Sequence, residues 1–356
     1  MRLNNFWDNK KVLLTGHTGF KGSWMLIWLL NLNAKVTGYS IDSGNYHDLF
    51  SQIHPSIKND FNHILGDIND FENLNTTIQK VKPDIVFHFA AQALVRESYT
   101  NPLGTWETNV MGSLKLLKAV KNLDGNCSIV MITTDKVYKN NEWIFGYREI
   151  DSLGGHDPYS ASKAAAEIAI NSWRSSFVGN KNHQKSNMFI ASARSGNVIG
   201  GGDWSKDRIF PDAIKSLRNG EKILVRNKNS TRPWQHILDP LFGYLTLAEK
   251  LSNNKNIYCD AFNFGPNLQS NKSVKFLVET ILSYWDGSWE DLKIEDDYHE
   301  AGLLNLNIDK VNKILDWHPK WDFQYSVQKT VEWYKNTFEG KDPYQACLDD
   351  INSFMQ

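Results

Sequence analysis

Cysteine is scarce in this sequence. Only Cys127, Cys259 and Cys347 occur among 356 residues. An odd and widely spaced set argues against a disulfide framework and against a structural zinc site, so we expect no metal.

Long apolar runs are also missing. No run approaches the ~20 residues that a membrane-spanning helix requires, so no membrane association is expected. Residues 1–11 are polar and lack the apolar core of a signal peptide. We therefore expect a cytoplasmic protein.

An excess of charge of either sign is absent as well. Lys and Arg together number 39 and Asp and Glu 40, which gives a net charge of −1. Such a chain has no field that would draw it to nucleic acid or to a membrane surface. The length permits a large core and more than one lobe.

A glycine-rich turn follows the first expected strand, residues 11–15. Gly16, Gly19 and Gly22 form a G-x-x-G-x-x-G pattern, and residues 23–32 continue with the apolar spacing of a helix. This order is typical of a dinucleotide-binding unit, whose glycines let a pyrophosphate approach the N–H groups at the helix start. The spacing differs from the common G-x-G-x-x-G, and a turn without a ligand remains the alternative.

Strands and helices then alternate. The expected strands cover 35–40, 63–68, 83–92, 127–136 and 188–194, and the expected helices include 70–81 and 101–122. This alternation predicts an α/β fold with a doubly wound parallel sheet of the Rossmann type. Right-handed crossovers would place the glycine-rich turn and the end of the 127–136 strand on one edge of the sheet.

Several strand ends carry candidates for cofactor contacts. Ser40 and Asp42 follow the second strand, where a polar or acidic side chain can bind the ribose diol of NAD. No Arg follows closely to hold a 2′-phosphate, which favours NAD over NADP. Asp67 ends the third strand and faces either an adenine amino group or its own loop. Ala90 and Ala91 at the next strand end suit close approach of a cofactor.

The strand at 127–136 is apolar until it ends in hydroxyls and charges. Ligands of open α/β sheets bind beyond the carboxyl ends of the strands. Thr134, Asp135 and Lys136 are therefore expected to face the site.

Tyr159 and Lys163 lie four residues apart at the start of another expected helix. Asp157 can cap this helix and Pro158 fits its first turn, so the pair shares one helix face. An ammonium near a phenol lowers the pKa of the phenol from about 10, which makes a base for an alcohol proton. By spacing alone, a surface pair is the alternative.

The regular alternation loosens after residue 194, where three consecutive glycines occupy 200–202. We expect a NAD-binding domain at 1–190, with returns near 232–262, and a second lobe at 191–356. The second lobe contains Arg208, Arg232 and His236, which are candidate contacts for a nucleotide diphosphate. Surface arginines are the alternative.

These motifs, taken together and in this order, resemble those of the extended short-chain dehydrogenase/reductases that act on nucleotide sugars. The pattern is most similar to the CDP-glucose 4,6-dehydratases. The resemblance covers nearly the whole chain and rests on residues 15–24, 66–68, 88–92, 134–136, 154–163, 194–204 and 232–236.

The resemblance implies a redox-neutral dehydration of a CDP-hexose with NAD recycled in one site. Tyr159, assisted by Lys163 and Thr134, would take the proton of the sugar 4-hydroxyl during oxidation at C4. Related dehydratases carry Asp-Glu where this chain has Asp135-Lys136. A protonated Asp135 would supply the proton for the departing 6-hydroxyl and a neutral Lys136 would take the C5 proton. A structural ion pair is the alternative role for Lys136.

Further implied roles concern the cofactor, the substrate and the assembly. The residues expected at NAD are Gly16, His17, Gly19, Phe20, Gly22, Ser40, Asp42, Asp67, Ile68, Phe89, Ala90, Ala91, Gln92, Asn109, Thr133, Tyr159 and Lys163. Those expected at the nucleotide sugar are Asn197, Arg208, Arg232 and His236. A homodimer through the 101–122 helix and the Tyr159 helix is expected, with a higher oligomer as an option.

Two other functions remain open at this point. One is a 4,6-dehydratase or a 4-epimerase acting on another nucleotide sugar, although an epimerase has no need of Asp135-Lys136. The other is a non-catalytic NAD-binding regulator, which the presence of both Tyr159 and Lys163 disfavours.

Overall fold

A seven-stranded parallel sheet forms the centre of the computed structural model, which describes residues 5–42, 44–45, 47–178, 187–253, 256–292 and 302–356. Its strand order is β11-β6-β5-β4-β1-β2-β3. The strands are β1 (Lys11–Thr15), β2 (Lys35–Ser40), β3 (Asn62–Leu65), β4 (Ile85–His88), β5 (Cys127–Ile132), β6 (Met188–Ser195) and β11 (Ala261–Phe264). The expected doubly wound Rossmann sheet is thus confirmed, and the order reverses between β1 and β4, where such folds bind ligands.

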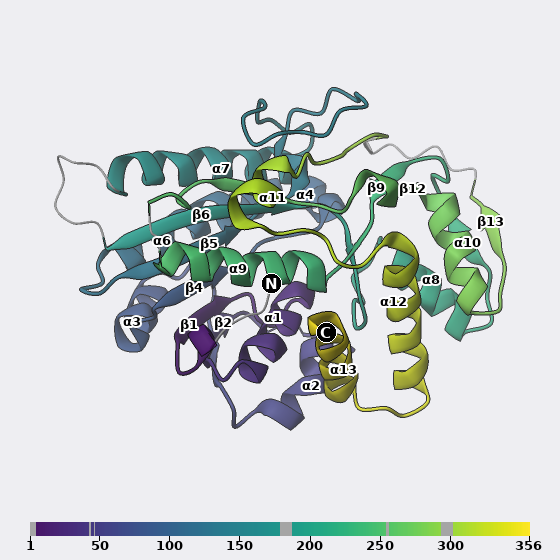
Figure 1. Ribbon diagram of the computed structural model, residues 1–356, viewed down its shortest axis with the longest axis horizontal. Coiled ribbons are helices and arrows are strands. Elements are labelled where there is room, and N and C mark those ends of the chain that lie inside the picture. The colour runs from purple at the N-terminus through teal and green to yellow at the C-terminus, as the bar shows by residue number, and fades with distance from the viewer. Residues whose placement is uncertain (1–4, 43, 46, 179–186, 254–255, 293–301) are drawn as a thin grey trace.

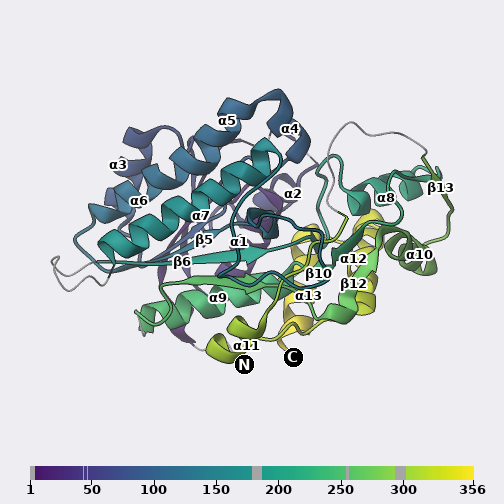
Figure 2. The same ribbon diagram turned by 90° about the horizontal axis from the view of Figure 1, so that it is seen from above.

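Helices cover both faces of this sheet (Figures 1 and 2). One face carries α3 (Phe71–Val81), α6 (Ser113–Lys121) and α7 (Pro158–Phe177), and the other carries α1 (Phe20–Asn31) and α9 (Leu238–Asn253). Every residue of β4, β5 and β6 is buried. Strands β4 and β5 are accordingly mostly apolar rather than alternating, whereas β6 also buries Ser192, Arg194 and Ser195.

Local sequence signals explain several helix starts. Asp157 accepts a hydrogen bond from the Ser160 N–H, and Pro158 fills the first position of α7. Asp70 caps α3 through the Asn73 N–H in the same way. Exchanging such a cap for Ala costs roughly 1 kcal/mol.

The expected helix over 101–122 is interrupted. It consists of α5 (Pro102–Trp106), a π-helical turn (Glu107–Gly112) and α6. The turn contains Asn109, whose amide reaches back to the Gln92 main chain. Such π segments occur frequently at functional sites.

The second lobe lies beyond the carboxyl ends of the strands, at the right of Figure 1. It contains α8 (Ile209–Arg218), α10 (Val274–Tyr284) and α12 (Phe323–Phe338) with three two-stranded sheets. These pair β7 (Val198–Ile199) with β10 (Gln235–His236), β8 (Ile223–Val225) with β13 (Trp289–Asp291), and β9 (Thr231–Pro233) with β12 (Asn271–Ser273).

The C-terminal half of the chain also returns to the sheet. Strand β11 pairs with β6, and α9 packs against β5 and β6. The last helix, α13 (Pro343–Met355), packs against α1 and against α2 (Leu49–Ile57). The short helices α4 (Val95–Thr100) and α11 (Asp309–Leu315) complete the two layers.

Candidate active site

A cleft of about 1640 Å³ lies between the sheet edge and the second lobe. Its walls combine the glycine-rich turn, the ends of β2 to β6, the start of α7 and the loop before α8. The predicted residues that line it are Gly16, Gly19, Phe20, Gly22, Ser40, Asp67, Ile68, Phe89, Ala90, Ala91, Gln92, Thr133, Thr134, Asp135, Lys136, Tyr159, Lys163, Asn197, Arg208 and Arg232.

The backbone of the glycine-rich turn is packed too tightly to admit side chains at Gly16 and Gly22. Gly16 has a φ of +75°, and a Cβ there would lie 2.6 Å from the Ala90 nitrogen. A Cβ on Gly22 would lie 2.1 Å from the Gly16 carbonyl oxygen. No side chain caps α1 at Gly19, which leaves the N–H groups of the first turn toward the cleft. This is the arrangement that binds a phosphate at a helix start.

The end of β5 continues into a 3-10 turn (Asp135–Val137) that presents three polar side chains. The Thr134 hydroxyl donates to Oδ1 of Asp135 at 3.0 Å. Oδ2 of Asp135 is buried without a hydrogen-bond partner among the described residues, and it lies against Gly196. Burial raises the pKa of Asp135 against the opposing effect of Lys136. This carboxyl group is therefore suited to hold a proton.

Tyr159 and Lys163 face the same point from α7. The Tyr159 phenol hydrogen-bonds to Thr134, and the Lys136 Nζ lies 6.0 Å from the centre of its ring. Both α7 residues are buried, at 8% and 7% exposure. A phenol, a hydroxyl, a carboxyl group and two lysine side chains thus line the same part of the cleft.

The expected lowering of the Tyr159 pKa is not what the structure gives. Burial raises the pKa of Tyr159 to about 12, because desolvation outweighs the Thr134 hydrogen bond. Burial also lowers the pKa of Lys163 to about 8, although Glu167 opposes this shift. The four-residue spacing correctly predicts that the two side chains share one face of the helix, but it does not predict how deeply they are buried.

Lys21 is a cleft residue that the sequence argument missed. Its Nζ donates to the Ser195 hydroxyl at 2.8 Å, and burial lowers its pKa to about 7. The sequence feature that could have indicated Lys21 is a lone lysine within the glycine-rich turn, at the start of an otherwise apolar helix.

Arginines line the opposite wall. Arg208 pairs with Asp203 at 2.9 Å, and Arg232 donates to the Thr231 carbonyl at 2.8 Å. Arg226, which also lines the cleft, pairs with Asp207 at 3.1 Å. This cationic wall suits a diphosphate.

Four predicted contact residues do not line the cleft. His17 is fully buried under Gly38 and hydrogen-bonds to His63 at 2.7 Å. His236 is fully buried beside Trp24 and Trp321, so it packs the core instead of meeting a substrate. Burial lowers the pKa of each of these two histidines to about 3, so both are neutral near pH 7.

Asn109 and Asp42 are the other two predicted contact residues that do not line the cleft. The Asn109 amide is buried and bonds to the Gln92 N–H at 2.9 Å and to the Ser162 hydroxyl at 2.9 Å. It therefore supports a cleft residue from behind. Asp42 is exposed and accepts a hydrogen bond from the Gly44 N–H at 3.1 Å.

The first half of the cleft fits a dinucleotide. The uncapped start of α1, the close approach of Gly16 to Ala90, and Ser40 and Asp67 after neighbouring strands all lie on this side of the cleft. The described residues contain no cluster of three His, Cys, Asp or Glu side chains arranged to hold a metal ion. No helix in the described part of the chain is both long and apolar enough to span a membrane.

Comparison with known proteins gives concordant results. Residues 13–330 match the family model described as GDP-mannose 4,6 dehydratase. A CDP-glucose 4,6-dehydratase of Salmonella typhimurium is 44% identical over 99% of this chain and 98% of its own. A CDP-paratose 2-epimerase of Salmonella typhi is 27% identical over 91% of this chain and 98% of its own.

Among solved structures, a dTDP-glucose 4,6-dehydratase of Bacillus anthracis in complex with NAD has the same fold. Its TM-score is 0.77 at 23% identity, and the match covers 94% of this chain and 99% of that one. The chain therefore belongs to the GDP-mannose 4,6 dehydratase family of nucleotide-sugar enzymes.

Proposed function

We propose that the protein is a CDP-glucose 4,6-dehydratase that converts CDP-glucose into CDP-4-keto-6-deoxyglucose and water, for deoxysugar synthesis. The observation that carries this proposal is the convergence of an acid–base pair, Asp135-Lys136, with Tyr159 and Thr134 in one cleft. The 44% identity to a CDP-glucose 4,6-dehydratase supports the same substrate.

NAD is the proposed cofactor, held by the glycine-rich turn, by Ser40 and Asp67, and by the small residues after β4. When bound, NAD would supply a hydride acceptor for C4 and, once reduced, a hydride donor for C6. Tyr159 takes the proton of the sugar 4-hydroxyl in its phenolate form, which the Lys163 ammonium stabilises, and Thr134 holds the same oxygen by a hydrogen bond.

The elimination of water depends on Asp135 and Lys136. A ketone at C4 makes the C5 proton acidic, and Lys136 takes that proton. Asp135, whose pKa is raised by burial, donates a proton to the 6-hydroxyl, which leaves as water. As C6 regains the hydride, the Lys136 ammonium returns its proton to C5, and the proton gained by Tyr159 makes up for the one that Asp135 gave to the departing water. The reaction is therefore redox-neutral, and no added reductant is consumed.

The remaining proposals concern assembly and location. Leu103, Met111 and Ile168 are exposed on the helices expected at the dimer contact, at 83%, 44% and 60% exposure. Covering these side chains by the same face of a second copy would bury apolar surface, which supports a homodimer. A cytoplasmic location and the two-domain division at residue 190 remain proposals from the sequence.

The test is incubation of the purified protein with CDP-glucose and no added oxidant or reductant. The expected product has lost one water by mass spectrometry and absorbs in alkali as a 4-keto-6-deoxy sugar. Dehydration of a dTDP- or GDP-hexose in place of CDP-glucose would refute the assigned base. Formation of an epimer without loss of water would refute the dehydratase.

A further inference from the structure

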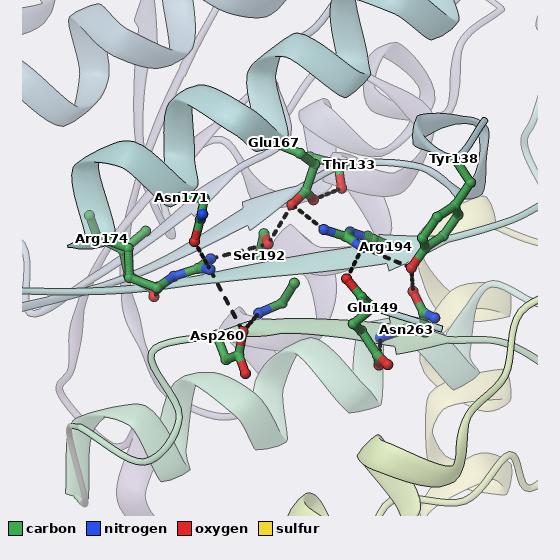
Figure 3. Close-up of polar contacts among 12 residues, drawn as sticks. Thr133, Tyr138, Glu149, Glu167, Asn171, Arg174, Ser192, Arg194, Asp260 and Asn263 are labelled. Carbon is green, nitrogen blue, oxygen red and sulfur yellow. Dashed lines mark hydrogen bonds and ion pairs between the residues drawn. The ribbon is translucent and has the colours of Figure 1, made fainter. Parts of the chain in front are cut away.

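Glu167 is a buried carboxylate beneath the catalytic residues, one helical turn after Lys163 on α7. Its side chain is 2% exposed and pairs with Arg194 Nη2 at 2.8 Å. It also accepts hydrogen bonds from the Thr133 hydroxyl at 2.5 Å and the Ser192 hydroxyl at 2.9 Å. Both oxygens of this carboxylate are thus engaged (Figure 3).

These contacts join the three elements that carry the cleft residues. Thr133 immediately precedes Thr134 after β5, and Arg194 immediately precedes the Ser195–Asn197 stretch at the end of β6. Arg194 extends the connection, because it donates to the Tyr138 hydroxyl at 2.8 Å. One carboxylate on α7 therefore ties this helix to the ends of both neighbouring strands.

Glu167 also acts on Lys163 through its charge. Tyr159 and Glu167 lie one helical turn before and after Lys163 on α7, and Lys21 on α1 and His88 at the end of β4 are close enough to feel its charge. His88 is neutral near pH 7, since burial lowers its pKa to about 3, and Lys21 repels the ammonium. Glu167 is the group that favours the charged form of Lys163.

We propose that Glu167 is a positioning residue, which holds α7 against the ends of β5 and β6 and provides the negative charge that accompanies the Lys163 ammonium. The role of this ammonium beside Tyr159 rests on the proposed dehydratase function. The placement of the charge does not depend on that function, because it rests on the one-turn spacing of Lys163 and Glu167 on α7 and on the contacts that hold the Glu167 carboxylate.

The variant Glu167→Gln keeps the shape of the side chain and removes its charge. Protein labelled with ¹⁵N at the lysine Nζ is titrated by NMR without substrate, and Lys163→Met assigns the signal. The Lys163 midpoint should move to lower pH by an amount on the order of one unit. An unchanged midpoint would overturn the proposal even if CDP-glucose proves not to be the substrate.

Turnover provides the second measurement. In Glu167→Gln the C4 oxidation step, which is monitored by NADH absorbance, should slow at least tenfold. The alkaline limb of its pH–rate profile should move with the Lys163 midpoint. Loss of activity without movement of the limb would reduce Glu167 to a packing residue. Failure of the wild type to use CDP-glucose would refute the proposed function but leave the NMR result intact.

A double variant separates positioning from stability. Glu167→Gln leaves the Arg194 charge buried and unpaired, which is destabilising, whereas Glu167→Gln with Arg194→Gln removes both charges. The double variant should regain thermal stability but not the wild-type Lys163 midpoint. Recovery of both would contradict the proposal, and this variant carries the test if the single one does not fold.

Asp260→Asn is the matched control. Asp260 is a carboxylate of the same region that pairs with Arg174 at 3.8 Å and with Lys310 at 2.6 Å, and it has no contact with the cleft. Its replacement should leave both the Lys163 midpoint and turnover unchanged. An equal shift in this control would show that the effect is not specific to Glu167.

Discussion

Lys136 is the residue on which the proposed elimination of water depends. We expect Lys136→Ala to retain oxidation at C4, because Tyr159, Thr134 and Lys163 are unchanged. Loss of water should fall by about 10²–10⁴-fold, the usual contribution of a general base. NADH absorbance follows the first step, and mass spectrometry of the sugar follows the second.

Lys139→Ala is the control for that experiment. Lys139 is an exposed lysine on the same cleft wall, three residues later, and should be dispensable for both steps. If Lys136→Ala slowed both steps equally, the base assignment would be wrong, and the role of Lys136 would be structural.

The pKa of Lys163 sets a second expectation at this scale. The proposed oxidation needs the ammonium form of Lys163 beside Tyr159. Because burial lowers the pKa of Lys163 to about 8, the ammonium is lost as the pH rises through that value. The rate of C4 oxidation should therefore fall above about pH 8, and stopped-flow measurement of NADH formation over pH tests this. A rate that keeps rising toward the pKa of Tyr159, about 12, would contradict it.

Some side chains could be placed from the sequence and others could not. Tyr159 and Lys163 were predictable because helix spacing fixes their common face. His236 was not, because its neighbours Arg232 and Trp234 resemble a ligand-binding stretch while its ring packs between Trp24 and Trp321 from distant parts of the chain.

At the scale of elements, strands β1 to β6 were predictable from their alternation with helical segments, and β1, β4 and β5 are short, mostly apolar runs followed by polar or small residues. The short strands of the second lobe were not predictable, since β7 and β10 are two residues each and β8, β9, β12 and β13 three. Such lengths carry no detectable periodicity. Helix α2 was also missed, and it contains Pro55, a residue that usually marks a helix end.

The glycine-rich turn allows a prediction about one element. Gly22→Ala would place a methyl group 2.1 Å from the Gly16 carbonyl oxygen, so α1 must shift away from β1. We expect a loss of roughly 1–3 kcal/mol in the free energy of unfolding, and weaker NAD binding. Urea denaturation and calorimetric titration with NAD measure the two effects.

Gly125→Ala is the matched control, because nothing lies within 4 Å of its added Cβ and its φ is not positive. It should change neither quantity beyond about 0.5 kcal/mol. Unaltered NAD affinity in Gly22→Ala would argue that the turn does not hold the cofactor.

At the scale of the whole molecule, the two halves of the sequence share one hydrophobic core. The cluster that contains Trp28 of α1 and Phe87 of β4 also contains Phe242 of α9 and Phe354 of α13. The first and second halves of the sequence therefore do not form two separate structural units. Neither the composition nor the local sequence pattern reveals this shared core. Contacts between residues more than 300 positions apart are set by tertiary packing alone.

Phe354 provides the sharpest test of this shared core. Its ring lies 5.8 Å from that of Trp28, 5.8 Å from that of Phe242 and 5.3 Å from that of Trp321, and it is 1% exposed. Phe354→Ala should lower the free energy of unfolding by about 3–5 kcal/mol, the usual cost of such a cavity. Phe145→Ala, at a ring that is 66% exposed, should change it by less than about 0.5 kcal/mol.

Cooperativity distinguishes a shared core from two independent lobes. Circular dichroism follows the helices of both halves, and tryptophan fluorescence includes Trp28, in the first half, next to the altered site. If the core is shared, the two signals should shift together in Phe354→Ala and remain a single urea transition. Separate transitions, with the first half unaffected, would mean that α13 adds little to the stability of the NAD-binding half, although it packs on α1 and α2.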